Sequence, residues 1–388
     1  MKFYRLAIFL TIFFVLYGLL NLYIYLGASE ALQYFAGSVG QNVFTGIFAF
    51  LILSYPVARI TGKWLPAVIA DFLAFIGGLW FAAMLYLIIS LVIIDVSALV
   101  ISFIPSLNYF VITNLPQINS TLFLTISIGM IALIVFGYYN ATNPRIKKLE
   151  LNVNKAPSGT KSLHIAFASD IHLGHVIGSK SLGKIISAIN SLDPDIVLFP
   201  GDLVDEELKT VIDKGLGKKF RQLKPKYGVF AVTGNHEYIG GADKAVEYLS
   251  QFGIRFLRDE MVKVADRFYV VGREDVSITS FYGKKRKSAP ELLDGYNPEL
   301  PVILMDHQPI SLSEAEAAGV DLQVSGHTHH GQMWPLSAIT KRVFKISWGY
   351  RKIGSSHFYV SSGAGSWGPR VRIGNHPEIV SIKLRFPG

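Results

Sequence analysis

Four long apolar segments dominate the first 140 residues of the chain. They are Phe3 to Leu26, Val43 to Ile60, Leu65 to Ile104 and Leu122 to Tyr139. At ~1.5 Å per helical residue, each is long enough, or nearly so, to cross ~30 Å of hydrocarbon. Residues 1–140 hold only four basic and three acidic side chains. The sequence therefore predicts an all-α transmembrane domain of four spans, in which the third is either one long tilted helix or a span with an interfacial piece, because Gly77 and Gly78 permit a bend.

Basic residues flank these segments on one side only. They are Lys2 and Arg5 before the first segment, Arg59 and Lys63 between the second and third, and Arg145, Lys147 and Lys148 after the fourth. The connections over residues 27–42 and 105–120 contain no Lys or Arg. Because positive charge is retained on the cytoplasmic side, we expect a multi-pass inner-membrane protein whose two termini, and everything after Lys148, are cytoplasmic.

Two carboxylates, Asp71 and Asp95, lie within the third segment. A single helix would place them towards opposite interfaces, where each reaches water. This reading is favoured over a proton or ion path through the membrane.

The chain changes character after the fourth segment. Residues 141–388 hold the other 33 Lys and Arg and 25 Asp and Glu residues, a net charge of +8. We interpret 141–158 as a linker and 159–388 as an α/β domain, because short apolar runs such as "DIVLFPGD" and "PVILMDH" alternate with amphipathic segments such as "SKSLGKIISAINSL". The absence of cysteine excludes a disulfide framework and thiolate metal ligands.

Polar residues follow five of these strand-like runs. They are Asp170 and His172, Asp202, Asn235 and His236, His307, and His327 and His329. The carboxyl ends of strands meet at one edge of an open sheet, so these side chains can converge there. Carboxylate, amide and imidazole groups suit Mn, Fe, Zn or Mg ions. A single histidine at a strand end is ordinary, but five such endings together predict a metal site.

The five blocks "DIH", "GDLVD", "GNHE", the isolated His307 and "GHTH" resemble, in order, those of the calcineurin-like metallophosphoesterase superfamily. The resemblance covers about residues 160–388 and implies a four-layer fold of two packed mixed β-sheets flanked by helices. The tail "SSGAGSWGPRVRIGNHPEIVSIKL" is also similar to a membrane-linked subgroup of bacterial phosphodiesterases that includes lipid A precursor (UDP-diacylglucosamine) hydrolases.

The resemblance implies two divalent cations, with Mn the first choice and Fe, Zn, Mg or Co as alternatives. Its blocks assign Asp170, His172 and His329 to one ion, and Asn235, His307 and His327 to the other. Asp202 would bridge them, since cations ~3.5–4 Å apart need a shared carboxylate. We expect His327 and His329 to project to the same side of an extended segment. The adjacent His330 is expected to be a supporting or solvent-facing group.

The implied reaction is attack on phosphorus by a hydroxide generated between the metals. By the same resemblance His236 would protonate the leaving oxygen, and Asp205 would hold its imidazole in the protonated form. An N-cap of the helix beginning near "EELKTVI" is the alternative role for Asp205.

Three sequence differences from other branches of the superfamily restrict the class of substrate that the resemblance implies. Ser/Thr protein phosphatases carry Arg-Gly after the second block, where Glu206 and Glu207 stand here. Purple acid phosphatases place Tyr at the position of Asp205, and the soluble lipid A precursor hydrolases replace the His that is retained here as His236. A phosphodiester or pyrophosphate substrate is the remaining interpretation.

The membrane segments indicate the bilayer and a lipid or lipid-linked phosphoester as partners. UDP-diacylglucosamine is the first choice of substrate and a phospholipid diester the second.

Residues 335–350 mix apolar and basic side chains and are either an interfacial element or an amphipathic pair packed on the core. Residues 283–288, "GKKRKS", either contact anionic lipid or form a solvated loop.

A nuclease or cyclic-nucleotide phosphodiesterase is disfavoured because no aromatic platform accompanies the motifs, so no nucleic acid partner is expected. A non-catalytic metal-binding membrane scaffold predicts damaged ligands, and none is missing.

Overall fold

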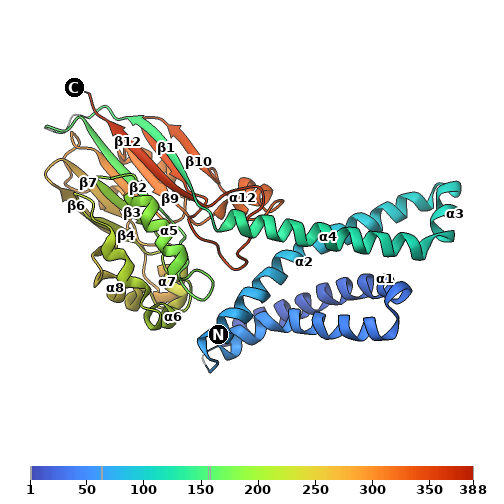
Figure 1. Ribbon diagram of the computed structural model, residues 1–388. Coiled ribbons are helices and arrows are strands. Elements are labelled where there is room, and N and C mark those ends of the chain that lie inside the picture. The colour runs from blue at the N-terminus through green and yellow to red at the C-terminus, as the bar shows by residue number, and fades with distance from the viewer. Residues whose placement is uncertain (1, 63, 156, 158, 388) are drawn as a thin grey trace. The chain divides into compact units, whose positions relative to one another are not determined.

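The computed structural model describes residues 2–62, 64–155, 157 and 159–387, and divides into two compact units, Met1–Gly137 and Tyr138–Gly388 (Figure 1). The first unit is helical. Its helices are α1 (Lys2–Thr61), α2 (Ala67–Ser102), α3 (Pro105–Thr113) and most of α4 (Leu115–Ala141).

Four helical stretches in the described part of the chain are long and apolar enough to cross a membrane, as predicted. They are Leu10–Leu32, Ala36–Thr61, Ala67–Ser102 and Leu115–Ala141. The first two are arms of α1, which departs from helical geometry at Gly37 (φ 58°, ψ −171°). The third is one helix with no break at Gly77 or Gly78, so of the two interpretations the long single helix is correct. Lys63, one of the basic residues used for the orientation, lies outside the described residues.

The two arms of α1 and helix α2 pack together through aromatic and polar contacts. The Tyr17 hydroxyl donates to the Ile52 carbonyl oxygen at 2.8 Å, which ties one arm to the other. The Trp80 indole of α2 donates to the Asn21 side-chain oxygen at 2.9 Å. The Tyr23 hydroxyl donates to the carboxylate of Asp95. Polar groups between these apolar helices are therefore paired with one another, as a low-dielectric environment requires.

The second unit contains two six-stranded sheets among its described residues. The first has the order β1 (Arg145–Asn152), β12 (Glu378–Arg385), β2 (Ser162–Phe167), β3 (Ile196–Pro200), β4 (Val229–Val232) and β5 (Ile254–Phe256). The second has the order β10 (Gly349–Ile353), β11 (Ser356–Val360), β9 (Leu322–Ser325), β8 (Val302–Met305), β7 (Phe268–Gly272) and β6 (Glu260–Val264).

Alternation along the central strands builds the layers. In β3, Ile196 and Leu198 face the core between the sheets, while Val197 and Phe199 face the helices that cover the first sheet. These outer helices include α5 (Ser179–Asn190), η1 (Leu216–Gln222) and α8 (Ala242–Ser250). Helices α10 (Ala289–Leu292) and α11 (Leu312–Ala317) cover the second sheet. The result is the predicted four-layer arrangement of helix, sheet, sheet and helix (Figure 1).

The remaining short helices lie close to the ends of strands. They are α6 (Leu208–Asp213), α7 (Asn235–Gly240), α9 (Ser277–Tyr282), η2 (His329–Gly331) and α12 (Ser337–Val343).

Part of the segment predicted to be a linker is a strand. Residues 145–152 form β1, which pairs in parallel with β12 in a register that sets Arg145 opposite Glu378. Its residues are mostly exposed and three of the eight are basic, so its sequence lacks the buried apolar pattern of the central strands. Only residues 142–144 separate α4 from this sheet.

A close approach of α1 and α2 yields a stability prediction. A Cβ atom on Gly77 would lie 2.5 Å from the Tyr55 Cβ and 2.6 Å from its backbone nitrogen. We expect Gly77→Leu to lower the free energy of unfolding by about 1–3 kcal/mol, measured by denaturation of the full chain in detergent. Gly129→Leu in α4 is the matched control, because nothing lies within 4 Å of its Cβ position. Equal midpoints for the two variants would contradict this packing.

Candidate metal centre

The predicted ligands meet at the carboxyl ends of five strands. Asp170 and His172 follow β2, Asp202 follows β3, Asn235 and His236 begin α7 after β4, His307 follows β8, and His327 and His329 follow β9. The His and Asp ligands form overlapping clusters whose ligand atoms lie within 4.8 Å of one another. These clusters are Asp170, His172 and His329; His172, Asp202 and His236; and Asp202, His307 and His327.

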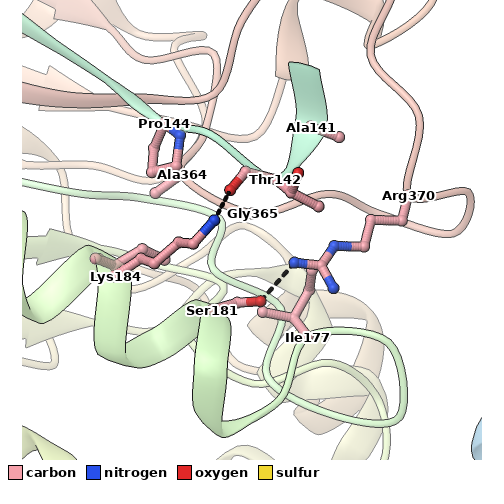
Figure 2. Close-up of a pocket in the computed structure, with 10 residues that line it drawn as sticks. Ala141, Thr142, Pro144, Ile177, Ser181, Lys184, Ala364, Gly365 and Arg370 are labelled. Atoms are coloured by element: carbon pink, nitrogen blue, oxygen red, sulfur yellow. Dashed lines mark hydrogen bonds between the residues drawn. The ribbon is translucent and has the colours of Figure 1, made fainter. Parts of the chain in front are cut away.

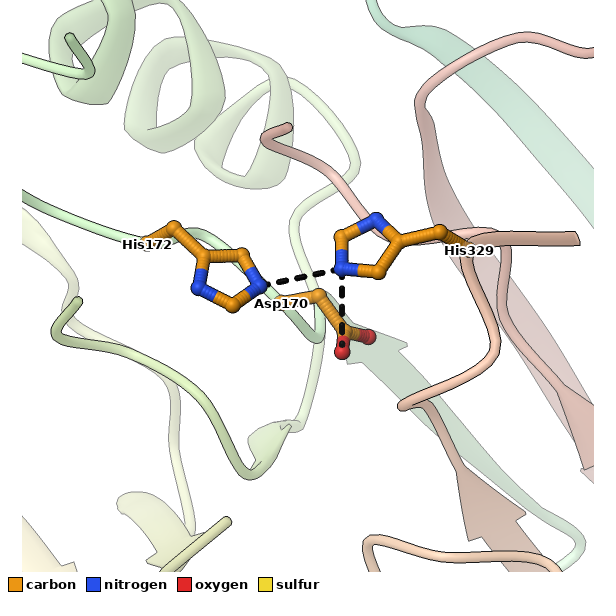
Figure 3. A group of neighbouring side chains, drawn as sticks. All are labelled: Asp170, His172 and His329. Carbon is orange, nitrogen blue, oxygen red and sulfur yellow. Dashed lines mark hydrogen bonds and ion pairs between the residues drawn. The ribbon is translucent and has the colours of Figure 1, made fainter. Parts of the chain in front are cut away.

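The first cluster aims its donor atoms at one point (Figure 3). The Nε2 atoms of His172 and His329 are 3.0 Å apart, and the latter lies 3.7 Å from the Oδ1 of Asp170. Asp170 is fully buried, and its Oδ2 has no hydrogen-bond partner among the described residues. A buried carboxylate oxygen without a donor is costly, and a divalent cation would satisfy it. The residues present therefore fit a bound cation.

The cluster that contains His307 and His327 is linked to the first through Asp202. Its Oδ2 lies 3.2 Å from the Nε2 of His307 and 3.8 Å from the Nε2 of His172. The Asn235 side-chain oxygen lies 2.8 Å from the Nδ1 of His327 and 3.2 Å from the Nε2 of His307. One carboxylate thus contacts ligands of both groups, which is the position expected for a bridge.

The charges within the cluster are strongly coupled. Burial alone would raise the pKa of Asp202, but the neighbouring imidazoles of His307 and His172 hold this pKa below its ordinary range. Burial alone would lower the pKa of His307, but the Asp202 carboxylate raises it well above its ordinary value. Burial, together with His172 and Arg372, lowers the pKa of His329 and so favours the neutral imidazole. Cations bound here would compete with the proton that His307 carries.

Most of the predicted ligands have an uncommon backbone conformation. Five of the seven have positive φ, between 45° and 71°: Asp170, His172, Asp202, His327 and His329. Left-handed geometry costs roughly 1–2 kcal/mol per non-glycine residue and is typical of functional sites. His327 and His329 therefore lie on a tight turn that leads into η2, and the expected extended segment is wrong.

Glycines allow the strand-end loops to approach one another. A Cβ on Gly326 would lie 2.2 Å from the Oδ2 of Asp170, and a Cβ on Gly234 would lie 2.2 Å from the Oδ1 of Asp202. Any larger residue would displace a ligand carboxylate. These glycines belong to the "GHTH" and "GNHE" blocks, so close packing explains their presence.

Glu237 holds the Asp202 loop in place. Its carboxylate accepts from the backbone nitrogens of Asp202 at 3.0 Å, Val204 at 2.8 Å and Gly234 at 2.7 Å. Burial and the neighbouring Asp202 carboxylate raise the pKa of Glu237 to about 7. The acidic residue of the third block therefore orients a ligand loop through its backbone.

His236 and Asp205 form a pair beside the cluster. The Nδ1 of His236 lies 3.0 Å from the Oδ1 of Asp205, and the His236 backbone nitrogen donates to the Oδ1 of Asp202 at 2.9 Å. Burial alone would lower the pKa of His236, but the carboxylates of Asp205 and Asp202 raise it. The N-cap residue of α6 is Glu207, with no side-chain cap bond, so the alternative capping role of Asp205 is wrong.

His330 lies outside the ligand clusters. Its side chain is buried, its Nδ1 lies 2.8 Å from the Ser347 hydroxyl, and its ring lies 5.2 Å from the Trp348 ring. The expectation of a supporting group fits this position.

Two buried residues that the motif blocks do not identify brace His329. The Arg372 guanidinium is fully buried, lies 3.2 Å from the His329 Nδ1 and donates to the Gly365 carbonyl at 2.7 Å. The Asn375 amide donates to the His329 carbonyl at 2.9 Å. Both lie in the tail "SSGAGSWGPRVRIGNHPEIVSIKL", which follows the last motif block, and no motif spacing identifies them.

The same loop is tied to the end of α4. The Asn140 amide donates to the carbonyl oxygens of Arg372 at 2.9 Å and Asn375 at 2.7 Å. The His376 Nδ1 lies 2.5 Å from the Asn140 side-chain oxygen. A continuous set of hydrogen bonds thus joins the last turn of α4 to a predicted ligand.

Comparison with known proteins identifies similar sequences. A sequence model of the family described as calcineurin-like phosphoesterase matches residues 163–331. The transmembrane protein with metallophosphoesterase domain of Danio rerio is 32% identical over 265 residues, which cover 65% of this chain and 60% of that protein. An uncharacterised metallophosphoesterase of Helicobacter pylori J99 is 32% identical, covering 64% of this chain and 66% of its own length. One of Aquifex aeolicus is 30% identical, covering 63% of this chain and 93% of its own length.

The bonds to Glu237 yield a prediction about assembly of the centre. In Glu237→Gln, one acceptor oxygen becomes an amide that faces backbone donors, so we expect a loss of about 1–3 kcal/mol in unfolding free energy and reduced metal content. Thermal unfolding and elemental analysis of the purified chain measure both. The control is Glu247→Gln, which changes an exposed carboxylate on α8. Wild-type metal content in Glu237→Gln would contradict the assigned role.

Proposed function

Because the chain belongs to the calcineurin-like phosphoesterase family, we propose that it hydrolyses a phosphodiester or pyrophosphate bond of a membrane lipid or lipid-linked nucleotide. The family supplies a dinuclear divalent metal centre and phosphoester hydrolysis. Four apolar helices, together with relatives named as transmembrane proteins, make the chain a membrane-anchored phosphoesterase. A lipid A precursor such as UDP-diacylglucosamine is the first choice of substrate, on the resemblance of the tail.

The roles of the metal ligands follow the two clusters. Asp170, His172 and His329 would hold one cation, Asn235, His307 and His327 the other, and Asp202 both. When bound, such a pair lowers the pKa of water beside the phosphate and offsets the charge on its oxygens. The mixture of carboxylate, amide and imidazole donors supports Mn, with Fe, Zn, Mg or Co as alternatives.

His236 and Asp205 would handle the leaving group. The Nδ1 of His236 faces the Asp205 carboxylate, which favours the protonated imidazole and leaves its Nε2 proton available. Transfer of that proton to the leaving oxygen prevents accumulation of negative charge there. Asp205 would orient the His236 imidazole and stabilise its positive charge.

The observation that supports a lipid substrate is a set of apolar side chains, two of which lie beside histidines of the centre. We define the rim as Trp334, Ile339, Val343, Phe344 and Trp367. The Phe344 ring lies 5.8 Å from that of His327, and the Trp367 ring lies 6.1 Å from that of His236. The other three are exposed, as is Trp367. Exposed aromatic and branched side chains next to a polar centre are typical of a surface that accepts acyl chains.

The same rim supports a phospholipid diester as the second candidate. The basic residues Lys341 and Arg342 of α12 stand among the apolar ones and would favour an anionic lipid surface. For the orientation we propose an inner-membrane protein with a cytoplasmic catalytic domain, on the basic residues that flank alternate connections.

Hydrolysis of bis-p-nitrophenyl phosphate with added Mn²⁺ tests the catalytic roles. We expect Asp202→Ala to lower the rate at least ~10³-fold, because both cations lose a shared ligand. We expect His236→Ala to lower it by about 10²–10⁴-fold while metal content is retained. His164→Ala in β2 is the control, since its Nε2 lies 2.8 Å from the Ser381 hydroxyl and the residue belongs to no ligand cluster of the described chain. Equal rates in all four proteins would remove the enzymatic proposal.

A substitution on the rim tests the substrate class. Val343 is 68% exposed, so Val343→Glu alters surface polarity without creating a cavity. We expect an increase of about ten-fold in the apparent KM for UDP-diacylglucosamine in mixed micelles, with an unchanged KM for bis-p-nitrophenyl phosphate, because only the acyl contact is lost. Ile212→Glu, on exposed α6 surface, is the control. A parallel change with both substrates would argue against a lipid-binding rim.

A further inference from the structure

A small pocket with both apolar and polar lining lies where α4 ends. Thr142 and Pro144 line one side, Ser181 and Lys184 of α5 another, and Gly365 and Arg370 a third (Figure 2). None of these residues is a predicted metal ligand. None of the described residues that line the pocket carries a carboxylate.

The two cationic side chains of the pocket retain unused donors. The Arg370 guanidinium donates to the Val176 carbonyl at 3.3 Å and the Ser181 hydroxyl at 2.5 Å, while its buried Nε has no hydrogen-bond partner in the described part of the chain. The Lys184 ammonium donates to the Thr142 carbonyl at 3.0 Å and the Asn143 side-chain oxygen at 3.3 Å. Arginine has five N–H donors and lysine three, so both can bind a further acceptor.

Neither cation has a carboxylate partner among the residues that the structure describes, and burial carries a cost for Arg370. Its Cζ lies 5.7 Å from the centroid of the Tyr138 ring, a cation–π contact. Burial lowers the pKa of Arg370, although Tyr138 acts in the opposite direction. An anion between Arg370 and Lys184 would compensate both charges.

The position of the pocket along the chain indicates which anion. Ala141, the last residue of the fourth candidate span, lines the pocket, and Thr142 follows it directly. The end of a membrane span lies at the level of the lipid headgroups, where tyrosines such as Tyr138 and Tyr139 are also enriched. The phosphates of anionic lipids are the abundant anions at that level.

We propose that this pocket binds the phosphate group of an anionic membrane lipid, with Arg370 and Lys184 as its donors. The lining residues include no predicted metal ligand, although the Gly365 backbone nitrogen donates to the Asp170 carbonyl at 2.9 Å. The proposal does not depend on which substrate the metal centre hydrolyses. A free phosphate ion offers the same oxygens, but it is dissolved in the bulk and is not concentrated at the end of a membrane span.

Native mass spectrometry of the full chain in neutral detergent tests this site. Phosphatidylglycerol and phosphatidylcholine with identical acyl chains are added separately, and bound lipid is counted. We expect wild type to prefer phosphatidylglycerol, and Arg370→Gln and Lys184→Gln each to weaken that binding about five-fold without affecting phosphatidylcholine. Lys184 is exposed, so its variant remains informative even where Arg370→Gln fails to fold.

Two controls separate this site from other binding. Lys180→Gln removes an exposed charge from the same helix outside the pocket and is expected to keep the preference. Asp202→Ala is also expected to keep it, which distinguishes the pocket from the metal centre. Equal phosphatidylglycerol binding by Arg370→Gln, Lys184→Gln and wild type would overturn the proposal, as would displacement of the lipid by millimolar inorganic phosphate.

Discussion

The burial of two carboxylates beside several imidazoles is the constraint on which the catalytic unit depends. Asp170 and Asp202 are 0% and 2% exposed, and isolated charges at such positions would destabilise the fold by several kcal/mol. Cationic partners must therefore be assembled around them from distant parts of the sequence. Two sheets packed face to face accomplish this, because the ends of β2, β3, β4, β8 and β9 bring these groups together. The left-handed backbone at five ligands is the conformational cost of that convergence.

The parts of this arrangement that the sequence predicts are those with a strong local pattern. Central strands such as β3 and β8 are fully buried on both faces, so they read as apolar runs that end in a ligand. The exposed strand β1 and the three-residue β5 carry no such pattern and depend on pairing with distant strands. The turn at His327 and His329 depends on Gly326 packing against Asp170, a contact that residue spacing does not reveal. Arg372 reads as an ordinary basic residue until the fold buries it beside His329.

The two units differ in the side chains that they expose and bury. In the first, apolar side chains such as Val39, Val68 and Ile128 face outwards, and polar ones such as Asn21 are paired inside. In the second, the apolar side chains form layers between sheets and helices, and buried charges such as Asp306 are paired with Arg273 and Arg286. Asn140 marks the transition, since it belongs to the last apolar helix but satisfies backbone carbonyls of the loop that braces His329.

The three residues between α4 and β1 have a kinetic consequence. Residues 142–144 span at most ~11 Å when fully extended. The chain that connects α4 to the sheet of the catalytic unit is therefore short. A phosphoester diffusing in the bulk must find this centre in three dimensions. One embedded in the same bilayer searches laterally within a thin layer. The turnover rate would then depend on the mole fraction of substrate among the surrounding lipids, and dilution of the vesicles would leave it unchanged.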